Sequence, residues 1–346
     1  MRTSKKVFVG SVAVGGGSKI TVQSMLNKPA EDVHGNIEQA KTLEMAGCEI
    51  LRVAVPNSQS VELVPAIKKA IKIPLVADIH FDYRLAIACV KAGVDAIRIN
   101  PGNIGSDERV REVAAACADR KIPIRIGVNS GSLEKDLLKK YGGPTPQALA
   151  ESALYHASLL EKFHFDDIVI SIKSSDVNCM IKANELVSSQ CDYPLHLGVT
   201  EAGSERMGII KSAIGIGSLL QRGIGDTIRV SLTADPVREV EAGIDLLKAL
   251  SLRGGIRIVS CPTCGRTRID LIPIVEEVEK RLTGLKKDLT VALMGCAVNG
   301  PGEAREADIG IAGGDGVGLI FKRGEIVRRV PENELVEALL QEIDQM

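Results

Sequence analysis

The chain of 346 residues contains no tryptophan, and aromatic residues make up only 3% of it. Few flat rings are therefore available to stack on bases or sugars. The formal net charge of −1 gives no electrostatic reason to expect a nucleic acid or a membrane surface as a partner. The sequence has no run of about 18 apolar residues, and its start, MRTSKKVFVGS, lacks the apolar core of a secretion signal. We therefore expect a cytoplasmic protein with neither a membrane nor a nucleic-acid partner.

The usual nucleotide-binding loops are also missing. No G-x-x-x-x-G-K-[ST] sequence occurs, and GIGSLL at 215–220 lacks a third glycine and does not follow a predicted strand. Eight cysteines in a cytoplasmic protein are expected to be free thiols or metal ligands rather than disulfides.

Strand-like and helix-like segments alternate through the first 250 residues. Several of the helix-like segments close on glycine, as NIEQAKTLEMAG does, which is typical of a helix C-terminus. The apolar, β-branched segments lie at 20–25, 49–55, 73–80, 96–102, 123–130, 167–174, 194–201 and 227–234. This pattern predicts a parallel sheet covered on both faces, and eight such units predict a (β/α)₈ TIM barrel. A doubly wound open sheet is the alternative.

Segments at both ends lie outside the eight units. VFVGSVAVGGGSKI (7–20) resembles a glycine-rich hairpin ahead of the first strand. After a last helix near 235–250, a second α/β pattern begins with IRIVSCPTCG and ends with the helix ENELVEALLQEIDQM. We therefore predict an α/β protein with two domains, a barrel over 1–253 and a smaller α/β domain over 254–346.

Five cations interrupt the apolar barrel strands, each expected in the carboxyl-terminal half, where barrel active sites form: Arg52, Arg98, Arg125, Lys173 and Arg229. Strand alternation places Asn100, Asn129 and Ser231 on the same faces as these cations. An ion pair with a barrel carboxylate would explain any one of these cations by itself. The acids at the strand ends are only Asp78 and Glu201, however, so about three charges are left for an anion such as a diphosphate.

Three cysteines have metal-ligand spacing. Cys261 and Cys264 share a C-P-x-C turn, and Cys296 precedes the glycine-containing turn NGPG, whereas the other five cysteines are scattered and are expected to be buried thiols. The set suits zinc or an iron–sulfur cluster. No cysteine or histidine follows Cys296, and the nearest remaining ligand is Glu303. A carboxylate binds a cluster iron weakly, so a cluster held in this way would be reactive rather than structural.

The motifs SCPTCGR, MGCAVNGPGEA, ADIGIAGG, QSM and GVTEAG resemble the bacterial 4-hydroxy-3-methylbut-2-enyl diphosphate synthases of the non-mevalonate isoprenoid pathway. The resemblance covers essentially the whole chain, in the short two-domain form of the family. It implies a dihydropteroate-synthase-like barrel that binds 2-C-methyl-D-erythritol 2,4-cyclodiphosphate. It also implies a reductase-like domain with a [4Fe-4S] cluster held by Cys261, Cys264, Cys296 and Glu303.

The resemblance further implies a reductive ring opening with loss of a hydroxyl, which consumes two electrons. No flavin or nicotinamide motif is present, so ferredoxin or flavodoxin is the expected external donor. Glu201 is a candidate acid/base group, or else forms a salt bridge to a neighbouring arginine. Asn299 either hydrogen-bonds substrate or cluster, or stabilises its own tight turn.

Chain lengths predict a homodimer. Helix 235–250 would run about 24 Å from the barrel mouth to its base, and a link of about five residues spans at most roughly 17 Å. The cluster domain therefore reaches a partner's barrel mouth more easily than its own, which predicts a head-to-tail dimer with a composite site.

Two other functions are compatible with the residues alone. One is a zinc-stabilised, dihydropteroate-synthase-like transferase acting on a phosphorylated substrate. The other is a non-catalytic iron–sulfur sensor, although five cations inside a barrel would then have no purpose.

Overall fold

The computed structural model describes residues 2–285, 287–297, 304–314 and 316–346. The chain forms two compact units, Met1–Leu252 and Arg253–Met346, and each is considered by itself.

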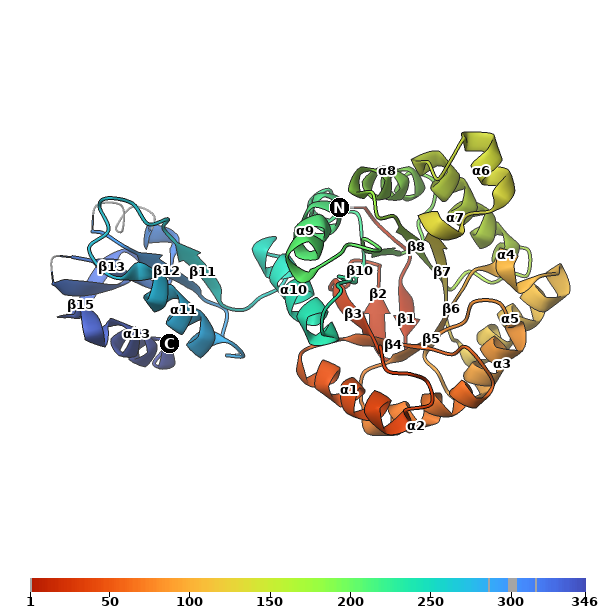
Figure 1. Cartoon of the computed structure of the whole chain (residues 1–346), viewed down its shortest axis with the longest axis horizontal. Helices are drawn as coiled ribbons and strands as arrows, with labels where there is room; N and C mark the ends of the chain where they lie inside the picture. Colours follow the sequence, from red (N-terminus) through yellow and green to blue (C-terminus); the bar gives the residue numbers. More distant parts are fainter. Residues whose placement is uncertain (1, 286, 298–303, 315) are drawn as a thin grey trace. The chain divides into compact units, whose positions relative to one another are not determined.

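The first unit is a closed barrel of eight parallel strands (Figure 1). Its strands are β3 (Thr21–Met25), β4 (Ile50–Ala54), β5 (Leu75–Asp78), β6 (Ala96–Ile99), β7 (Ile124–Asn129), β8 (Ile168–Lys173), β9 (Leu195–Leu197) and β10 (Thr227–Ile228). They follow one another around the barrel in chain order, and β10 closes the ring by pairing with both β9 and β3. The predicted TIM barrel is confirmed, and the open-sheet alternative is wrong.

Helices surround the ring of strands (Figure 1). They are α1 (Val33–Met45), α2 (Leu63–Ala70), α3 (Tyr83–Lys91), α4 (Pro101–Ile104), α5 (Asp107–Arg120), α6 (Lys135–Tyr141), α7 (Pro146–Glu161), α8 (Val177–Ser188), α9 (Glu205–Gln221) and α10 (Pro236–Ala249). Capping side chains begin several of them: Asp176 accepts from the backbone N–H of Cys179 at α8, and Asp235 from that of Val237 at α10. GIGSLL lies inside α9, as expected for a segment that is not a nucleotide-binding loop.

A hairpin closes the amino-terminal end of the barrel. Strands β1 (Val7–Val9) and β2 (Val12–Val14) pair antiparallel, which confirms the predicted hairpin. Val9 and Val14 are buried against the first inward-facing residues of three strands: Ile50, Val76 and Ala96. Inward-facing polar residues higher in the barrel are therefore shielded from solvent at this end.

The barrel ends with a turn packed onto its own surface. After α10, the backbone N–H of Leu252 donates to the carbonyl oxygen of Leu247 at 2.9 Å, and Leu250 and Leu252 pack against the barrel core. Only residues 253–256 therefore link the barrel to the first strand of the second unit.

The second unit is a five-stranded sheet in the order β11-β12-β13-β14-β15. Strands β11 (Arg257–Ser260), β12 (Thr290–Met294) and β13 (Ile309–Gly313) are parallel, and β14 (Val317–Lys322) and β15 (Glu325–Pro331) continue the sheet antiparallel. Helices α11 (Leu271–Leu282) and α13 (Leu335–Asp344) share one apolar core with the sheet. Sequence analysis missed β15, because this edge strand carries exposed charges, including Arg328 and Arg329, rather than a buried apolar run.

Short 3₁₀ helices complete the described structure: η1 (Gln59–Glu62), η2 (Ser130–Ser132), η3 (Ala304–Glu306) and η4 (Glu332–Glu334). In the part of the chain that the structure describes, no helix is both long and apolar enough to cross a membrane.

Candidate active site

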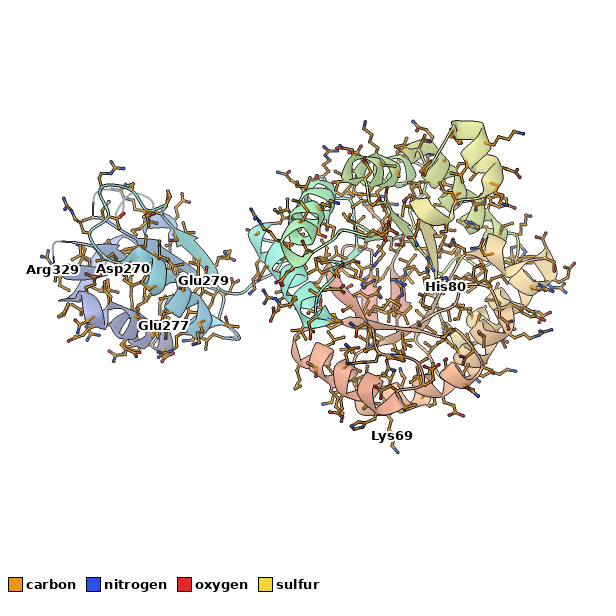
Figure 2. All side chains as sticks on the ribbon, in the orientation of Figure 1. Lys69, His80, Asp270, Glu277, Glu279 and Arg329 are labelled. Carbon is orange, nitrogen blue, oxygen red and sulfur yellow. The ribbon has the colours of Figure 1, made fainter. Side chains whose placement is uncertain are left out.

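The barrel interior is charged, unlike the apolar core of an ordinary barrel. Surface charges on the covering helices point outward, as Lys69 of α2 does (Figure 2). Arg98, Arg125 and Lys173 are 6–7% exposed. The side chains of Arg52 and Arg229 are 14% and 17% exposed. Charges buried to this extent need counter-charges or a bound ligand.

Asp78, the last residue of β5, pairs with two of the cations. Arg52 Nη2 donates to Asp78 Oδ2 at 2.7 Å, and Arg98 Nη1 donates to Oδ1 at 3.3 Å. His80 Nε2 lies 3.3 Å from the same carboxylate. Burial by itself would raise the pKa of Asp78, but Arg52, His80 and Arg98 outweigh it and hold the pKa well below its usual range. Asp78 is therefore ionised and orients both guanidinium groups.

The second buried counter-charge is Glu239 of α10, which sequence analysis missed. Arg229 Nη2 donates to Glu239 Oε2 at 3.2 Å, and the Leu232 N–H donates to Oε1 at 2.9 Å. Ser24 Oγ donates to Oε2 at 3.3 Å. Glu239 shares the buried face of α10 with Pro236, Val240, Gly243 and Leu247, and its place on this helical stripe is the signal that could have found it.

Glu201 does not supply the counter-charge expected from the sequence. It is exposed, it follows β9 with a left-handed φ of 52°, and no cation among the described residues forms an ion pair with it. The predicted pair of acids, Asp78 and Glu201, is therefore corrected to Asp78 and Glu239.

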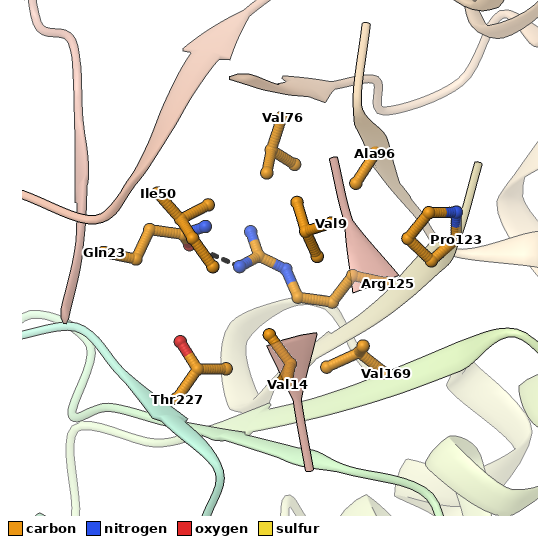
Figure 3. Close-up of a pocket in the computed structure, with 10 residues that line it drawn as sticks. All are labelled: Val9, Val14, Gln23, Ile50, Val76, Ala96, Pro123, Arg125, Val169 and Thr227. Atoms are coloured by element: carbon orange, nitrogen blue, oxygen red, sulfur yellow. Dashed lines mark hydrogen bonds between the residues drawn. The ribbon is translucent and has the colours of Figure 1, made fainter. Parts of the chain in front are cut away.

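Arg125 lies lower in the barrel than predicted. It is the second residue of β7, in the amino-terminal half of the strand rather than the carboxyl-terminal half. Its Nη1 donates to Gln23 Oε1, and its side chain lines a small cavity of about 20 Å³ above the hairpin (Figure 3). Its neighbours in this cavity include Val9 and Val14 of the hairpin, so the cation lies near the amino-terminal end of the barrel rather than at its mouth. No carboxylate among the described residues forms an ion pair with it.

Two inward-facing glycines make room for the long cations. A Cβ atom on Gly127 of β7 would lie 2.1 Å from Arg98 Nε, and one on Gly198, just after β9, would lie 2.7 Å from Lys173 Nζ. Arg98 Nη2 also donates to the carbonyl oxygen of Gly127 at 2.8 Å. Any larger residue at either position would displace a cation.

The predicted polar neighbours lie at the carboxyl ends of the strands. Asn100 is buried, and its Oδ1 accepts from the Gly127 N–H at 3.1 Å. Asn129 pairs in register with Lys173 at the ends of β7 and β8. Ser231 is half-buried, but it lies in a loop, because β10 covers only two residues of the predicted strand 227–234.

His196 of β9 adds a buried imidazole that the sequence did not indicate. It is fully buried, and neither ring nitrogen has a hydrogen-bond partner among the described residues. Burial and the surrounding cations, Arg125 first, hold its pKa well below the usual value. His196 is therefore neutral. With all five cations protonated, the two buried carboxylates leave an excess of three positive charges in the described interior.

Two of the three spaced cysteines lie at one edge of the second sheet. Cys261 directly follows β11, and Cys296 follows the neighbouring parallel strand β12. The Gly295 N–H lies 3.1 Å from Cys261 Sγ and donates to it. Cys264 is exposed, and hydrogen bonds from the backbone and the side chain of Arg266 lower its pKa. Donors aimed at sulfur favour thiolates, so this donor set suits a cluster with thiolate ligands.

The predicted fourth ligand, Glu303, and the candidate residue Asn299 lie outside the described residues. Within the described ranges, no three His, Cys, Asp or Glu side chains come close enough together to hold a metal ion. The structure thus places Cys261 and Cys296 at one sheet edge without gathering all three thiols around a point.

The remaining cysteines behave as ordinary thiols. All eight cysteines are free, as expected. Burial raises the pKa of Cys48, Cys89 and Cys117 to about 12. Cys179 and Cys191 are only half-buried, so the prediction that all five are buried is wrong for these two.

Fold and site together define a TIM-barrel protein with a cationic interior, followed by a small α/β domain that presents cysteines at one sheet edge. The chain belongs to the GcpE family: residues 4–244 match the GcpE TIM-barrel domain, and residues 257–345 match the GcpE protein C-terminal domain. The resemblance noted from the sequence motifs is thereby confirmed.

Curated relatives match over nearly the whole chain. A protein of Clostridium acetobutylicum is 60% identical over 344 residues, covering 99% of both chains, and one of Geobacter sulfurreducens is 55% identical over 99% of this chain and 98% of its own. Both are named 4-hydroxy-3-methylbut-2-en-1-yl diphosphate synthase (flavodoxin). Among solved structures, dihydropteroate synthase from Stenotrophomonas maltophilia matches 72% of this chain and 97% of its own, with a TM-score of 0.54 and 13% identity. That likeness shows the barrel fold alone.

Proposed function

We propose that this chain reduces 2-C-methyl-D-erythritol 2,4-cyclodiphosphate to 4-hydroxy-3-methylbut-2-enyl diphosphate in isoprenoid biosynthesis. The reaction opens the ring, removes a hydroxyl and consumes two electrons. The observation that carries the proposal is the cationic barrel interior in a chain 60% identical to a curated synthase over its full length. Neither a dihydropteroate-synthase-like transferase nor an iron–sulfur sensor is supported by the names of these relatives.

The substrate's diphosphate supplies the negative charge that the barrel lacks. Its proposed ligands are the five interior cations, with Asn100, Asn129 and Ser231 as neutral hydrogen-bonding groups near the mouth. Arginine suits this role because its planar fork donates two parallel hydrogen bonds to phosphate oxygens. Asp78 and Glu239 pre-orient three of the four arginines, Arg52, Arg98 and Arg229, which lowers the cost of ordering them when the ligand binds.

A [4Fe-4S] cluster held by Cys261, Cys264, Cys296 and Glu303 is the proposed redox cofactor. When bound, it would deliver electrons singly to the carbon–oxygen bond that breaks. The hydrogen bonds to the sulfurs of Cys261 and Cys264 support thiolate ligation at these two positions. Glu201, exposed after β9, is the proposed proton donor or acceptor at the reacting carbon, and Asn299 a proposed hydrogen-bonding group beside Cys296.

The electron donor is flavodoxin, as the names of the relatives suggest, and ferredoxin is the alternative. Eight free thiols and an oxygen-sensitive cofactor fit the cytoplasm, which we propose as the compartment.

The proposed assembly is a head-to-tail homodimer in which the cluster domain of one chain completes the barrel site of the other. Helix α10 leads away from the carboxyl ends of the strands, and its 14 residues span about 21 Å. The four linking residues 253–256 then reach at most roughly 14 Å, so they favour a partner's barrel mouth over that of the same chain.

The test is anaerobic turnover of the cyclodiphosphate with a reducing dye. We expect the wild type to carry iron and sulfide in cluster stoichiometry and to form the allylic diphosphate. Cys296→Ser should lose both the cluster and at least about 10³-fold in turnover, because one thiolate ligand is gone. Cys179→Ser, which alters a half-buried thiol outside the motif, is the matched control and should retain both. An active, iron-free Cys296→Ser protein would refute the proposal.

A further inference from the structure

Lys173 differs from the other four interior cations in having no side-chain partner among the residues that the structure describes. Arg52 and Arg98 share Asp78, Arg229 pairs with Glu239, and Arg125 donates to Gln23. Among the described residues, neither a carboxylate nor a hydrogen-bond acceptor binds the ammonium group of Lys173, although the residue is only 7% exposed. Its amine lies over Gly198, inside the barrel.

The surroundings of this amine are mostly positive. The charged and titratable groups around it come from strands β4, β7 and β9, from the loop after β10 and from α10: Arg52, Arg125, His196, Arg229 and Glu239. Burial first, and then Arg229, Arg52 and Arg125, hold the pKa of Lys173 well below its usual value, and the carboxylate of Glu239 opposes them only in part.

Lysine is also the cation here that can give up its charge. Arginine stays protonated in proteins, so the four guanidinium groups cannot relieve the excess charge of an empty barrel. His196 is already neutral. The remaining route is loss of the Lys173 proton, and a bound polyanion would reverse it by placing negative oxygens beside the amine.

We propose that Lys173 is the proton acceptor of this pocket: its amine is neutral while the barrel is empty, and it takes up a proton from solvent when a diphosphate binds beside it. This inference rests on the proposed diphosphate site and adds its protonation chemistry. The barrel thereby carries less repulsive charge without ligand and reaches its full complement of five cations only around the ligand.

The direct test is isothermal titration calorimetry of the full-length protein with inorganic pyrophosphate, at pH 8 in Tris and in HEPES, whose ionisation heats differ. The difference between the binding enthalpies observed in the two buffers gives the number of protons taken up. Lys173→Arg is charged at every pH, so the wild type should take up about one proton more than this variant. Lys139→Arg, the same change on the exposed side of α6, should match the wild type.

Two further measurements guard against a misfolded variant and a wrong acceptor. Between pH 7 and 9, the pyrophosphate affinity of the wild type should fall more steeply with pH than that of Lys173→Arg or Lys173→Met, by an extra factor of about ten per pH unit. The reason is that neither variant has a side chain that can take up a proton at this position. His196→Gln should retain the proton uptake, because its imidazole is not the acceptor.

Equal proton uptake by the wild type and Lys173→Arg, or loss of uptake in His196→Gln, would overturn the inference while leaving the diphosphate site intact. Failure of pyrophosphate to bind to the wild type at all would instead overturn the proposed site, and the inference with it.

Discussion

At the scale of single residues, the charge balance of the barrel depends on Asp78. Its carboxylate is almost fully buried and accepts from both Arg52 and Arg98, so folding requires it to be ionised. Its role differs from that of Glu239, which pairs with a single arginine and also accepts hydrogen bonds from the Leu232 N–H and the Ser24 hydroxyl. Removing either acid would leave a buried guanidinium without a counter-charge, which is costly.

The low pKa of Asp78 predicts a specific acid sensitivity. Because the folded-state pKa lies below the unfolded value of about 3.9, Asp78 stabilises the fold fully above that value, and the contribution is lost as the pH falls through and below it. Asp78→Asn should therefore be about 3 kcal/mol less stable than the wild type at pH 7, and its stability should change less between pH 5 and pH 2. Urea denaturation across this range measures both.

Asp136→Asn, on the exposed surface of α6, is the control and should follow the wild-type profile within about 0.5 kcal/mol. Parallel pH profiles for the wild type and Asp78→Asn would contradict the assigned role of Asp78.

At the scale of elements, the inward faces of neighbouring strands are matched in size, with a long cation on one strand and a glycine on the next. Arg98 of β6 extends across Gly127 of β7, and Lys173 of β8 extends across Gly198 after β9. The hairpin β1–β2 complements this arrangement by sealing the amino end with valines. The cations are therefore confined laterally by glycine backbone and from below by an apolar plug.

Gly127→Ala tests this complementarity. The added methyl would fall within 3 Å of three guanidinium atoms of Arg98, and the nearest of them is Nε at 2.1 Å, so we expect Arg98 to shift away from Asp78. Pyrophosphate affinity should fall by at least about tenfold, since one charge-assisted hydrogen bond pair contributes about 1.5–3 kcal/mol. The measurement is the same calorimetric titration.

Gly217→Ala on α9 provides the comparison, because an added methyl there meets no atom within 4 Å. It should leave affinity unchanged and raise stability by roughly 0.5–1 kcal/mol, as expected for alanine replacing glycine in a helix. Unchanged affinity in Gly127→Ala as well would show that Arg98 can be displaced without consequence.

At the scale of the whole molecule, the proposed division of labour places binding in Met1–Leu252 and redox chemistry in Arg253–Met346. Each unit has its own apolar core, and four residues join them. Because the link between these independently packed units is short, it matters whether the two units of one active site come from the same chain or from two chains.

Mixing two inactive variants answers that question. Lys173→Met disables the barrel and Cys296→Ser the cluster domain, so neither homodimer should turn over substrate. If each site combines the barrel of one chain with the cluster domain of its partner, half of the dimers in an equimolar, re-equilibrated mixture are mixed, and one of their two sites is intact. Activity should then recover to about a quarter of the wild-type value.

Native mass spectrometry of the same mixture, with one of the two variants labelled with ¹⁵N, serves as the reference for subunit exchange. No recovery of activity in the double-variant mixture, when that reference shows full exchange, would mean that each site is formed within one chain.

Much of this architecture is encoded locally. The alternation of apolar segments and glycine-ended helices is a short-range pattern, and it correctly predicts the barrel, the hairpin and the α/β character of the second unit. The cations were identifiable from the sequence because a charged side chain inside an apolar strand segment is unusual. A side chain that points inward from a parallel strand cannot reach solvent, so its charge needs another partner. Of the three cysteines with metal-ligand spacing, Cys261 and Cys296 lie at one edge of the second sheet, after the neighbouring strands β11 and β12.

Only the tertiary structure decided which groups meet. Glu239 rather than Glu201 neutralises Arg229, because packing of α10 against β3 brings Glu239 beside Ser24, 215 residues away in the chain. Arg125 lies in the lower layer of the barrel, and Lys173 has no counter-charge in the described part of the chain, because strand stagger sets the height of each side chain and pairing depends on distances of a few ångströms. Sequence periodicity gives the face on which a residue lies, but it carries no information about such distances between remote segments.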